Sequence, residues 1–461
     1  YQARKQARQF YFQYYKSMFK PRVDFSMFAP SLRENVSPIE RADGLPVYNS
    51  TGIMQAGGNL KFTYMLPTGG NLSLNSQLYR EDLKTVLALK DYETLKSKQA
   101  NSSLSLNFSQ PIFTANTLKE NLLEAEYWYE QSSSQFTRGQ MDIVFNVTEG
   151  FYALYKAIRE VEIASEKLEN SEEAYRIAKL KGETGKIPEG DVLIAEIGVS
   201  QNKAALLSKQ GDLEREKDKF IQTIGLDQEE DIQIITDLRY DTYTIDMDKA
   251  REEALKNRLE IYEAELDIKL QQIDLEQAKR VKELSGEITA YYDITGVSTT
   301  QSNSTGDLFN SSFDNFVDRP PNRGITLTFS YPIFDWGRGS SRVQEEEVTL
   351  KEVKLQHENL QRTIAREVKD VVRRMEVARE QLIINEKNQE VAQRSYGISR
   401  MRFENGDMTS QELGREQERL AESQLQYLNA FIAYQLATAD LKRKTLWDFR
   451  NNQSYLIDTN E

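Results

Sequence analysis

The sequence predicts an α+β protein built from two structural repeats, each of which joins amphipathic strands to very long helices. Three observations predict this fold class. The pentapeptide Ser-Gln-Pro-Ile-Phe at 109–113 returns as Ser-Tyr-Pro-Ile-Phe at 330–334, which is 221 residues later (330 − 109). Segments with alternating apolar and polar residues precede each pentapeptide, and long runs with helical spacing follow it. A repeat at this period indicates a duplication, so the two halves are expected to share one fold.

The composition excludes several classes of protein. The 461 residues include no Cys and a single His, His357, so no disulfide and no Cys- or His-based metal site is expected. The 59 basic and 72 acidic residues give a formal charge of −13, which disfavours nucleic acid as a partner. No apolar run of about 18 residues occurs, so no transmembrane helix is predicted. The sequence contains no phosphate-binding loop and no nucleophile–base constellation, and we expect neither an enzyme nor a cofactor.

The first repeat is predicted to cover residues 1–225. It starts at Tyr1 inside a helical pattern, so a leader and the beginning of that helix are expected to precede it. Residues 59–79 alternate around a Pro-Thr-Gly-Gly turn and are interpreted as an extra hairpin, with irregular or charged loops before it and at about 80–100. The other predicted elements are a helix end at about 1–18, strands at about 22–30 and 101–110, a long helix at 114–181 and a helix at 191–224.

The second repeat is predicted to cover residues 248–447. Residues 226–247 are irregular and acidic and are interpreted as an equatorial linker element between the repeats, while 448–461 form a C-terminal tail. A Ser-, Thr- and Asn-rich loop is expected at about 296–323. The predicted elements of this repeat are a helix at 248–284, strands at about 286–295 and 324–332, a long helix at 337–404 and a helix at 410–446.

Both long helices carry the apolar seam of a coiled coil. In the first, apolar residues run from Val144 to Val161 in steps of 3, 4, 3, 4 and 3. In the second, they run from Ile364 to Leu382 in steps of 4, 3, 4, 3 and 4. A helix of about 68 residues would be roughly 100 Å long. Such a helix needs packing partners along its whole length, because tertiary contacts supply most helical stability.

The alternating strands fit two different settings. In a soluble sandwich their apolar face would be buried, whereas in an outer-membrane barrel that face would meet lipid and the Ser, Asn and Thr residues would face water. The alternation alone does not decide between these settings. The soluble setting corresponds to the alternative function, a coiled-coil scaffold with a small β-domain.

Several motifs together resemble the TolC-type outer membrane efflux family. They are the two Ser-x-Pro-Ile-Phe corners, the Arg402-Phe403-x-x-Gly406 turn and the acid six residues after each turn glycine. Asn257-Arg258 also resembles the start of a family helix, although Leu259 stands where the family has proline. The resemblance covers nearly the whole chain. It implies an α+β membrane protein in which a trimeric transmembrane β-barrel, with four strands per chain or alternatively six, continues into a long periplasmic α-helical barrel.

The function implied by the resemblance is a passive outer membrane channel, located in the cell outer membrane with a periplasmic extension. It would be the exit duct of a tripartite efflux or type I secretion system. The implied partners are outer membrane lipid, a periplasmic adaptor (membrane fusion) protein and an inner-membrane transporter of the RND or ABC type. Four strands are too few to close a barrel, and open edges do not persist in lipid, which supports a homotrimer. We expect twelve strands in the trimer, with eighteen as the alternative.

The resemblance also implies candidate sites on the helices. Asp191 and Glu412 are candidates for a lumen gate, either as an anionic ring or, in the plainer interpretation, as helix caps. Arg415 departs from an acidic family position, so a contact between Glu412 and Arg415 of neighbouring chains is an alternative latch. The adaptor-docking tips would be the two helical turns, although helix C-caps fit the same residues: Gly185, Lys186, Ile187, Gly406, Asp407 and Met408.

The membrane boundary is predicted at the two repeated corners. Proline suits this place because it can start a helix but cannot donate a hydrogen bond to a strand ladder. The aromatic residues nearby, which include Tyr331, fit either an interfacial belt or a core between strand and helix. The predicted boundary residues are Pro111, Phe113, Pro332, Phe334 and Trp336.

Overall fold

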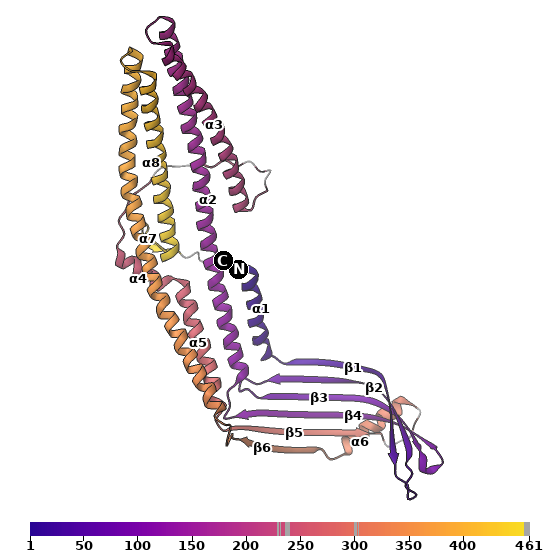
Figure 1. Cartoon of the computed structure of the whole chain (residues 1–461). Coiled ribbons are helices and arrows are strands. Elements are labelled where there is room, and N and C mark those ends of the chain that lie inside the picture. The colour runs from indigo at the N-terminus through magenta and orange to yellow at the C-terminus, as the bar shows by residue number, and fades with distance from the viewer. Residues whose placement is uncertain (228–229, 231, 236–239, 299–301, 303, 456–461) are drawn as a thin grey trace. The chain divides into compact units, whose positions relative to one another are not determined.

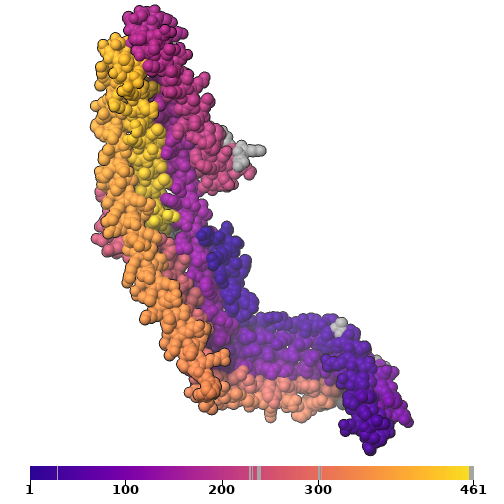
Figure 2. All heavy atoms as spheres, viewed as in Figure 1, coloured from indigo at the N-terminus to yellow at the C-terminus, as the bar shows by residue number. Residues whose placement is uncertain are grey.

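The computed structural model describes residues 1–461 except 228–229, 231, 236–239, 299–301, 303 and 456–461. The chain forms two compact units (Figures 1 and 2). A helical unit comprises Tyr1, 133–265 and 354–461, and a sheet unit comprises 2–132 and 266–353.

The sheet unit contains one antiparallel sheet of six strands in the order β1-β2-β3-β4-β5-β6. Strands adjacent in the sequence are therefore adjacent in the sheet, and the helices between residues 117 and 280 lie in the connection from β4 to β5 (Figure 1). The strands are β1 (Arg22–Ile39), β2 (Val47–Met65), β3 (Asn71–Leu87), β4 (Glu93–Ile112), β5 (Ser285–Val297) and β6 (Asn322–Ser330).

The sheet corrects the expected number and length of strands. The preferred count of four strands per chain is wrong, because the hairpin predicted at 59–79 supplies β2 and β3 as full members of the sheet. The loops expected before residue 59 and at 80–100 are largely strand as well. The β3–β4 ladder runs without a register shift from Asn71 to Leu87. Backbone hydrogen bonds hold this ladder whatever the side chains are, so alternation of apolar residues misses its charged part.

Side-chain alternation gives the sheet one apolar and one polar face. On β4 and β5, Leu106 lies opposite Tyr292 on the apolar face, whereas Ser105 lies opposite Asp293 on the polar face and donates a hydrogen bond to it. The apolar face is open to solvent in the single chain, where Met27 is 75% exposed. The expectation of one apolar face per strand is thus confirmed.

A helix, α6 (Thr305–Asp318), lies in the segment expected to be a loop and rests on the apolar face, near Ser102 of β4 and the C-terminal end of β5. Ser312 is fully buried and hydrogen-bonds Ser102 at 2.8 Å and the carbonyl of Gly296 at 3.1 Å. A Cβ on Gly296 would lie 2.0 Å from the Ser312 carbonyl oxygen, so only glycine allows this approach.

The helices of the two repeats keep the period of the pentapeptides. The long helices begin at Thr117 and Arg338 (338 − 117 = 221), and the helices after them begin at Glu189 and Ser410 (410 − 189 = 221). No helix in the described part of the chain is long and apolar enough to cross a membrane. The helices are α1 (Gln2–Met18), α2 (Thr117–Glu183), α3 (Glu189–Ile224), α4 (Met247–Asn257), α5 (Leu259–Arg280), α7 (Arg338–Asn405) and α8 (Ser410–Thr445).

The helix predicted at 248–284 is interrupted. Arg258 adopts an extended conformation with ψ 124° and separates α4 from α5. The linker expected at 226–247 lies partly outside the described residues. In the C-terminal region, β7 (Trp447–Asp448) and β8 (Gln453–Ser454) form a short hairpin, and the end of the predicted tail, 456–461, lies outside the described residues.

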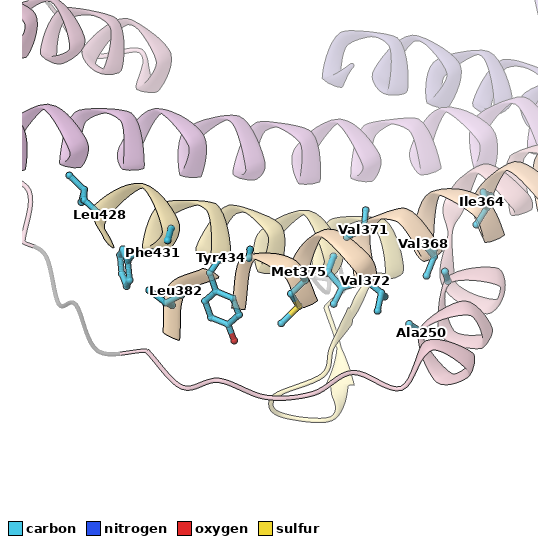
Figure 3. Close-up of a cluster of buried hydrophobic side chains, with 14 of the residues drawn as sticks. Ala250, Ile364, Val368, Val371, Val372, Met375, Leu382, Leu428, Phe431 and Tyr434 are labelled. Atoms are coloured by element: carbon cyan, nitrogen blue, oxygen red, sulfur yellow. The ribbon is translucent and has the colours of Figure 1, made fainter. Parts of the chain in front are cut away.

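The core of the helical unit confirms the second seam but not the first (Figure 3). Along α2 only Leu154 of the predicted seam is buried, and Val144 is 39% exposed. The cluster around the α7 seam includes residues of α2, α4, α5 and α8 of the same chain, among them Tyr155, Phe431 and Tyr434. All six predicted seam residues of α7 are buried: Ile364, Val368, Val371, Met375, Ala378 and Leu382.

Candidate functional site

The turns α2–α3 and α7–α8, both in the helical unit, have the same backbone. Gly185 and Gly406 have φ angles of 70° and 95°, a left-handed conformation that favours glycine. In the first turn the Lys186 N–H donates to the Lys181 carbonyl at 2.9 Å, and in the second the Asp407 N–H donates to the Arg402 carbonyl at 2.9 Å. These bonds satisfy the last carbonyls of each long helix, as in a Schellman C-cap.

The six predicted tip residues fall into two groups. Gly185, Lys186, Gly406 and Asp407 are exposed, and a Cβ on either glycine would meet no atom within 4 Å. Ile187 and Met408, which differ by the repeat period of 221 (408 − 187), are instead half-buried. They pack on a second apolar cluster of five buried residues: Ala178, Tyr396, Phe403, Leu413 and Leu420. Only the first group offers an open surface.

Lys181 is a residue that the motifs did not single out. Its ammonium donates a hydrogen bond to the Phe403 carbonyl and lies 4.8 Å from the centre of the Phe403 ring. It thereby ties the end of α2 to the end of α7. The residue one repeat later, Arg402, is exposed, and among the described residues its side chain donates a hydrogen bond within its own turn, to the Asp407 carbonyl at 3.4 Å. The sequence did not predict this contact, because Lys181 and Arg402 are both basic residues at equivalent positions of the two repeats.

Glu412 forms a capping box at the start of α8. Its carboxylate accepts hydrogen bonds from the Thr409 N–H at 2.9 Å and the Thr409 hydroxyl at 3.0 Å, and the hydroxyl accepts from the Glu412 N–H at 3.2 Å. The hydrogen bond from the Thr409 backbone is the main cause that lowers the pKa of Glu412 below its usual range, and the hydrogen bond from the Thr409 hydroxyl is the second. Asp191 occupies the same position of α3, where Pro188 precedes the helix and provides no side-chain cap.

Arg415 lines a groove of about 410 Å³ between α2, α3 and α8. Lys167 of α2 forms an ion pair with Glu418 of α8 in its wall. Gly198 and Gly414 also line the groove, and a Cβ on either would meet nothing within 4 Å. Within the chain, no ion pair between Glu412 and Arg415 is found among the described residues, so the predicted latch between neighbouring chains stays a prediction.

At the corners, the aromatic side chains are exposed and do not form a core. Trp336 is 89% exposed, and its ring lies 4.7 Å from that of Phe334. Phe113, Tyr331 and Phe334 are exposed as well. The interpretation as a core between strand and helix is therefore wrong for the single chain.

The two prolines lie near the ends of their strands and do not start the helices, which corrects the expectation that they would. Pro111 lies opposite Glu287 near the end of β4, and each long helix begins six residues after its proline (117 − 111 and 338 − 332). The caps differ between the corners. Asn116 accepts from the Lys119 N–H at 3.0 Å, whereas Asp335 accepts from two glycine N–H groups at 2.7 and 2.9 Å. These two bonds hold the pKa of Asp335 below its usual range.

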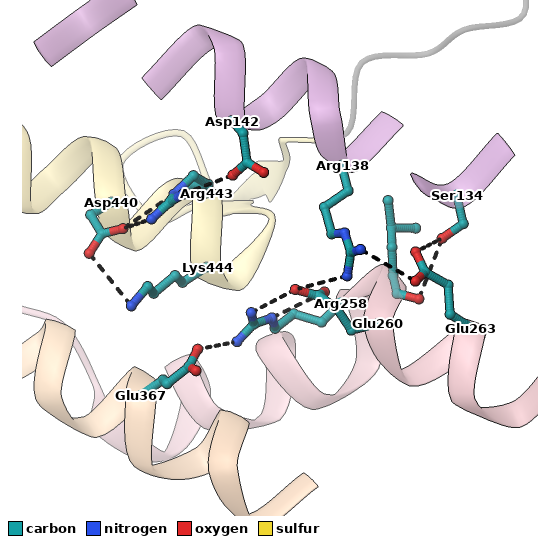
Figure 4. A network of polar contacts seen from close by, with 11 residues as sticks. Ser134, Arg138, Asp142, Arg258, Glu260, Glu263, Glu367, Asp440, Arg443 and Lys444 are labelled. Atoms are coloured by element: carbon teal, nitrogen blue, oxygen red, sulfur yellow. Dashed lines mark hydrogen bonds and ion pairs between the residues drawn. The ribbon is translucent and has the colours of Figure 1, made fainter. Parts of the chain in front are cut away.

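A network of ion pairs surrounds the break at Arg258 (Figure 4). Arg258 binds Glu260 at 2.7 Å and Glu367 at 2.7 Å, and Arg138 lies 3.5 Å from Glu263. Burial acts to raise the pKa of Glu260, but the hydrogen bonds and charge of Arg258 outweigh it and lower that pKa. The guanidinium thus holds the extended residue that separates α4 from α5. Among the described residues, no group of three or more His, Asp or Glu could hold a metal ion.

Comparisons with known proteins agree with this architecture. The family model described as "Outer membrane efflux protein" matches residues 66–225 and 250–445. Among curated proteins, none gives a significant sequence match. Three of the solved structures that match illustrate the shared fold. CusC matches at 14% identity and a TM-score of 0.65, with 96% of this chain and 87% of that chain covered.

The other two structures are the CmeC outer membrane channel of Campylobacter jejuni and the outer membrane protein VceC of Vibrio cholerae. CmeC shares 15% identity and a TM-score of 0.62, covering 96% of this chain and 81% of its own. VceC shares 14% identity and a TM-score of 0.62, covering 95% and 90%. At these identities the likeness concerns the fold.

Proposed function

Because the chain belongs to the outer membrane efflux protein family, and is an outer membrane channel with a periplasmic helical extension, we propose that three copies assemble into one exit duct. A periplasmic adaptor and an inner-membrane transporter of the RND or ABC type would open and energise it. The family consists of channel proteins, and we infer that this chain has no catalytic role.

The open edges of the sheet carry this proposal. Six strands end in two unpaired edges, β1 on one side and β6 on the other. Edges of this kind must be paired within a lipid bilayer. Three chains would supply eighteen strands, with β6 of one chain beside β1 of the next. The exposed apolar face would then meet lipid, and the polar face with Ser105 and Asp293 would line the bore.

An exposed apolar stripe on α7 supports the same assembly. Four residues recur at intervals of seven on a helix whose other seam is already buried, which is the spacing of a second coiled-coil seam. On α3, Leu193, Ile197 and Leu207 are likewise exposed. We propose that these two surfaces meet between neighbouring chains. The stripe, 55% to 56% exposed at each residue, consists of Val377, Ile384, Val391 and Ile398.

The exposed turn residues are the proposed adaptor contacts. Gly185, Lys186, Gly406 and Asp407 present accessible backbone and two charged side chains of opposite sign. Ile187 and Met408 would support the turns from beneath. The proposed lumen gate includes Asp191, Glu412 and Arg415, with Lys181 added because it holds the ends of α2 and α7 together.

The test is assembly together with ion conduction. The full chain should sediment in detergent as a trimer and conduct ions in planar bilayers. Ile384→Asp should prevent trimer formation by placing a charge in the proposed seam. Gln393→Glu, at an exposed polar position on the opposite side of the same helix, should not. A monomeric wild-type protein without conductance would refute the duct and favour a soluble scaffold.

A further inference from the structure

The apolar face of the sheet becomes basic at its end remote from the long helices. Lys84 of β3 lies directly opposite Lys96 of β4. The next pair on the same face, toward the apolar residues, is Asp82 and Lys98. Even-numbered residues of β3 and β4 share one face because side chains alternate and the register does not shift. The lysines therefore continue the face that carries Leu78 and Leu106.

Like charges placed directly opposite each other destabilise a sheet, so this arrangement calls for a compensating anion. The nearby carboxylates are already engaged. Asp82 binds Arg80 at 2.7 and 2.8 Å, and Glu34 accepts a hydrogen bond from Ser50 at 2.8 Å. Among the described residues, neither Lys84 nor Lys96 forms an ion pair.

The lysines border a depression in the sheet. Gly52 of β2 lies opposite Lys84 and carries no side chain, and the hollow here measures about 330 Å³. In the part of this face around the depression, four positively charged side chains accompany two carboxylates, in a chain whose formal charge is −13. The positively charged residues are Arg80, Lys84, Lys96 and Lys98, and the carboxylates are Glu34 and Asp82.

Helix α6 lies at the border between the apolar and basic parts of this face. It is held by Ser102, which lies on β4 between Leu104 and Lys98, and by a 2.7 Å hydrogen bond from Arg80 to Thr305. Phe313 and Val317, one helical turn apart, are 47% and 79% exposed. A helix with an apolar exposed side at such a border is typical of a membrane interface.

We propose that the lysine depression binds the phosphorylated headgroup of a glycolipid in the outer leaflet, while the acyl chains lie along the apolar face below it. The inference rests on the proposed orientation, in which the long helices are periplasmic and the opposite end of the sheet faces outward. Lysines bind phosphate as point charges, and an anionic membrane surface attracts each of them by about 1 kcal/mol.

The experiment compares two lipids on the full-length protein in uncharged detergent. Diphosphorylated lipid A is titrated against dephosphorylated lipid A with the same acyl chains, and bound lipid is counted by native mass spectrometry. The wild type should prefer the phosphorylated form, and added salt should weaken this preference. Lys84→Gln with Lys96→Gln should lower it about 25-fold, or about fivefold per lysine. Lys61→Gln is the control, because Lys61 lies on the polar face of β2.

Equal binding of the two lipids by the wild type, or an equal loss in Lys61→Gln, would overturn the proposal. Displacement of lipid A by the same concentration of inorganic phosphate would also overturn it, in favour of a free anion. Conductance in bilayers is measured on the same preparation. A conducting protein without lipid preference would refute the lipid site alone, whereas absent conductance would refute the duct.

Discussion

The two long helices, α2 and α7, occupy equivalent places in the two repeats but differ in which of their residues are buried. They have 67 and 68 residues, and corresponding positions differ by 221. Ile364 of α7 is 1% exposed, whereas its counterpart Ile143 of α2 is 59% exposed. Val371 corresponds to Gly150. The duplication has therefore preserved backbone and length, while several seam positions that are buried in α7 are not buried at the equivalent places in α2. The core around α7 includes residues of α2, α4, α5 and α8.

The turns at the ends of these helices differ in the same direction. Both have the glycine and the C-cap, but only the second has the capping box of Thr409 and Glu412. Conversely, Lys181 of the first reaches across to Phe403 of the second. The second turn thus has a side-chain cap that the first lacks, and the first turn contributes a contact to the second. Paired substitutions at equivalent positions test this asymmetry.

The largest difference is expected between Ile364→Ala and Ile143→Ala. Loss of a buried isoleucine side chain should lower the free energy of unfolding by about 2–5 kcal/mol at Ile364. The same change at Ile143 should alter it by no more than about 0.5 kcal/mol, because the side chain is largely in solvent. Denaturant titration followed by helical circular dichroism measures both. A comparable loss at Ile143 would contradict the asymmetry and indicate that another chain covers α2.

The next largest difference is expected between Lys181→Met and Arg402→Met. Lys181→Met removes a charge-assisted hydrogen bond and a cation–π contact, together about 2 kcal/mol of local stability. Arg402→Met removes one long hydrogen bond within its own turn and should have little effect. Amide hydrogen exchange at 400–410 should accelerate only in the first variant. Equal exchange in both would mean that Lys181 does not hold the two helix ends together.

A smaller effect is expected from the helix caps. Thr409→Ala should destabilise the first turn of α8 by about 1 kcal/mol, because the Glu412 N–H loses its acceptor. Pro188→Ala, at the matching position of α3, removes no side-chain cap and should cost less. Exchange of the Glu412 amide reports the first change and that of the Asp191 amide the second. The prediction fails if the two amides respond alike.

The smallest effect concerns pH. The pKa of Glu412 is lower in the folded chain, so its contribution is complete above the usual glutamate pKa of about 4.3 and is lost as pH falls through the folded value. The first turn of α8 should therefore fray below about pH 4, and Glu412→Gln should remove this dependence. Amide-exchange rates, corrected for their intrinsic pH dependence, provide the measurement. Fraying at the same pH in the Gln variant would assign it to another group.

The long helices and the repeat could be predicted from the sequence, because a sustained helical spacing and a fixed period are strong signals. The start of α7, expected at 337, is Arg338 in the structure. The full length of the strands was harder to predict. Lys84 and Lys96 belong to a continuous ladder that is held by backbone bonds, and no side-chain pattern marks it. Lys181 was missed because its partner is a carbonyl on a distant helix.

The edges of the sheet are unequal, and this has a consequence for the isolated chain. β1 has 18 residues but β6 only 9, so a neighbour's β6 can pair with half of β1. The remaining half could recruit any extended peptide and seed aggregates. It is protected by Pro30 and Pro38, which lack an N–H donor, by the irregularity between Phe28 and Ser31, and by Arg33. The β1 edge can thus pair with one neighbouring strand, while its remaining half is protected from pairing with other peptides.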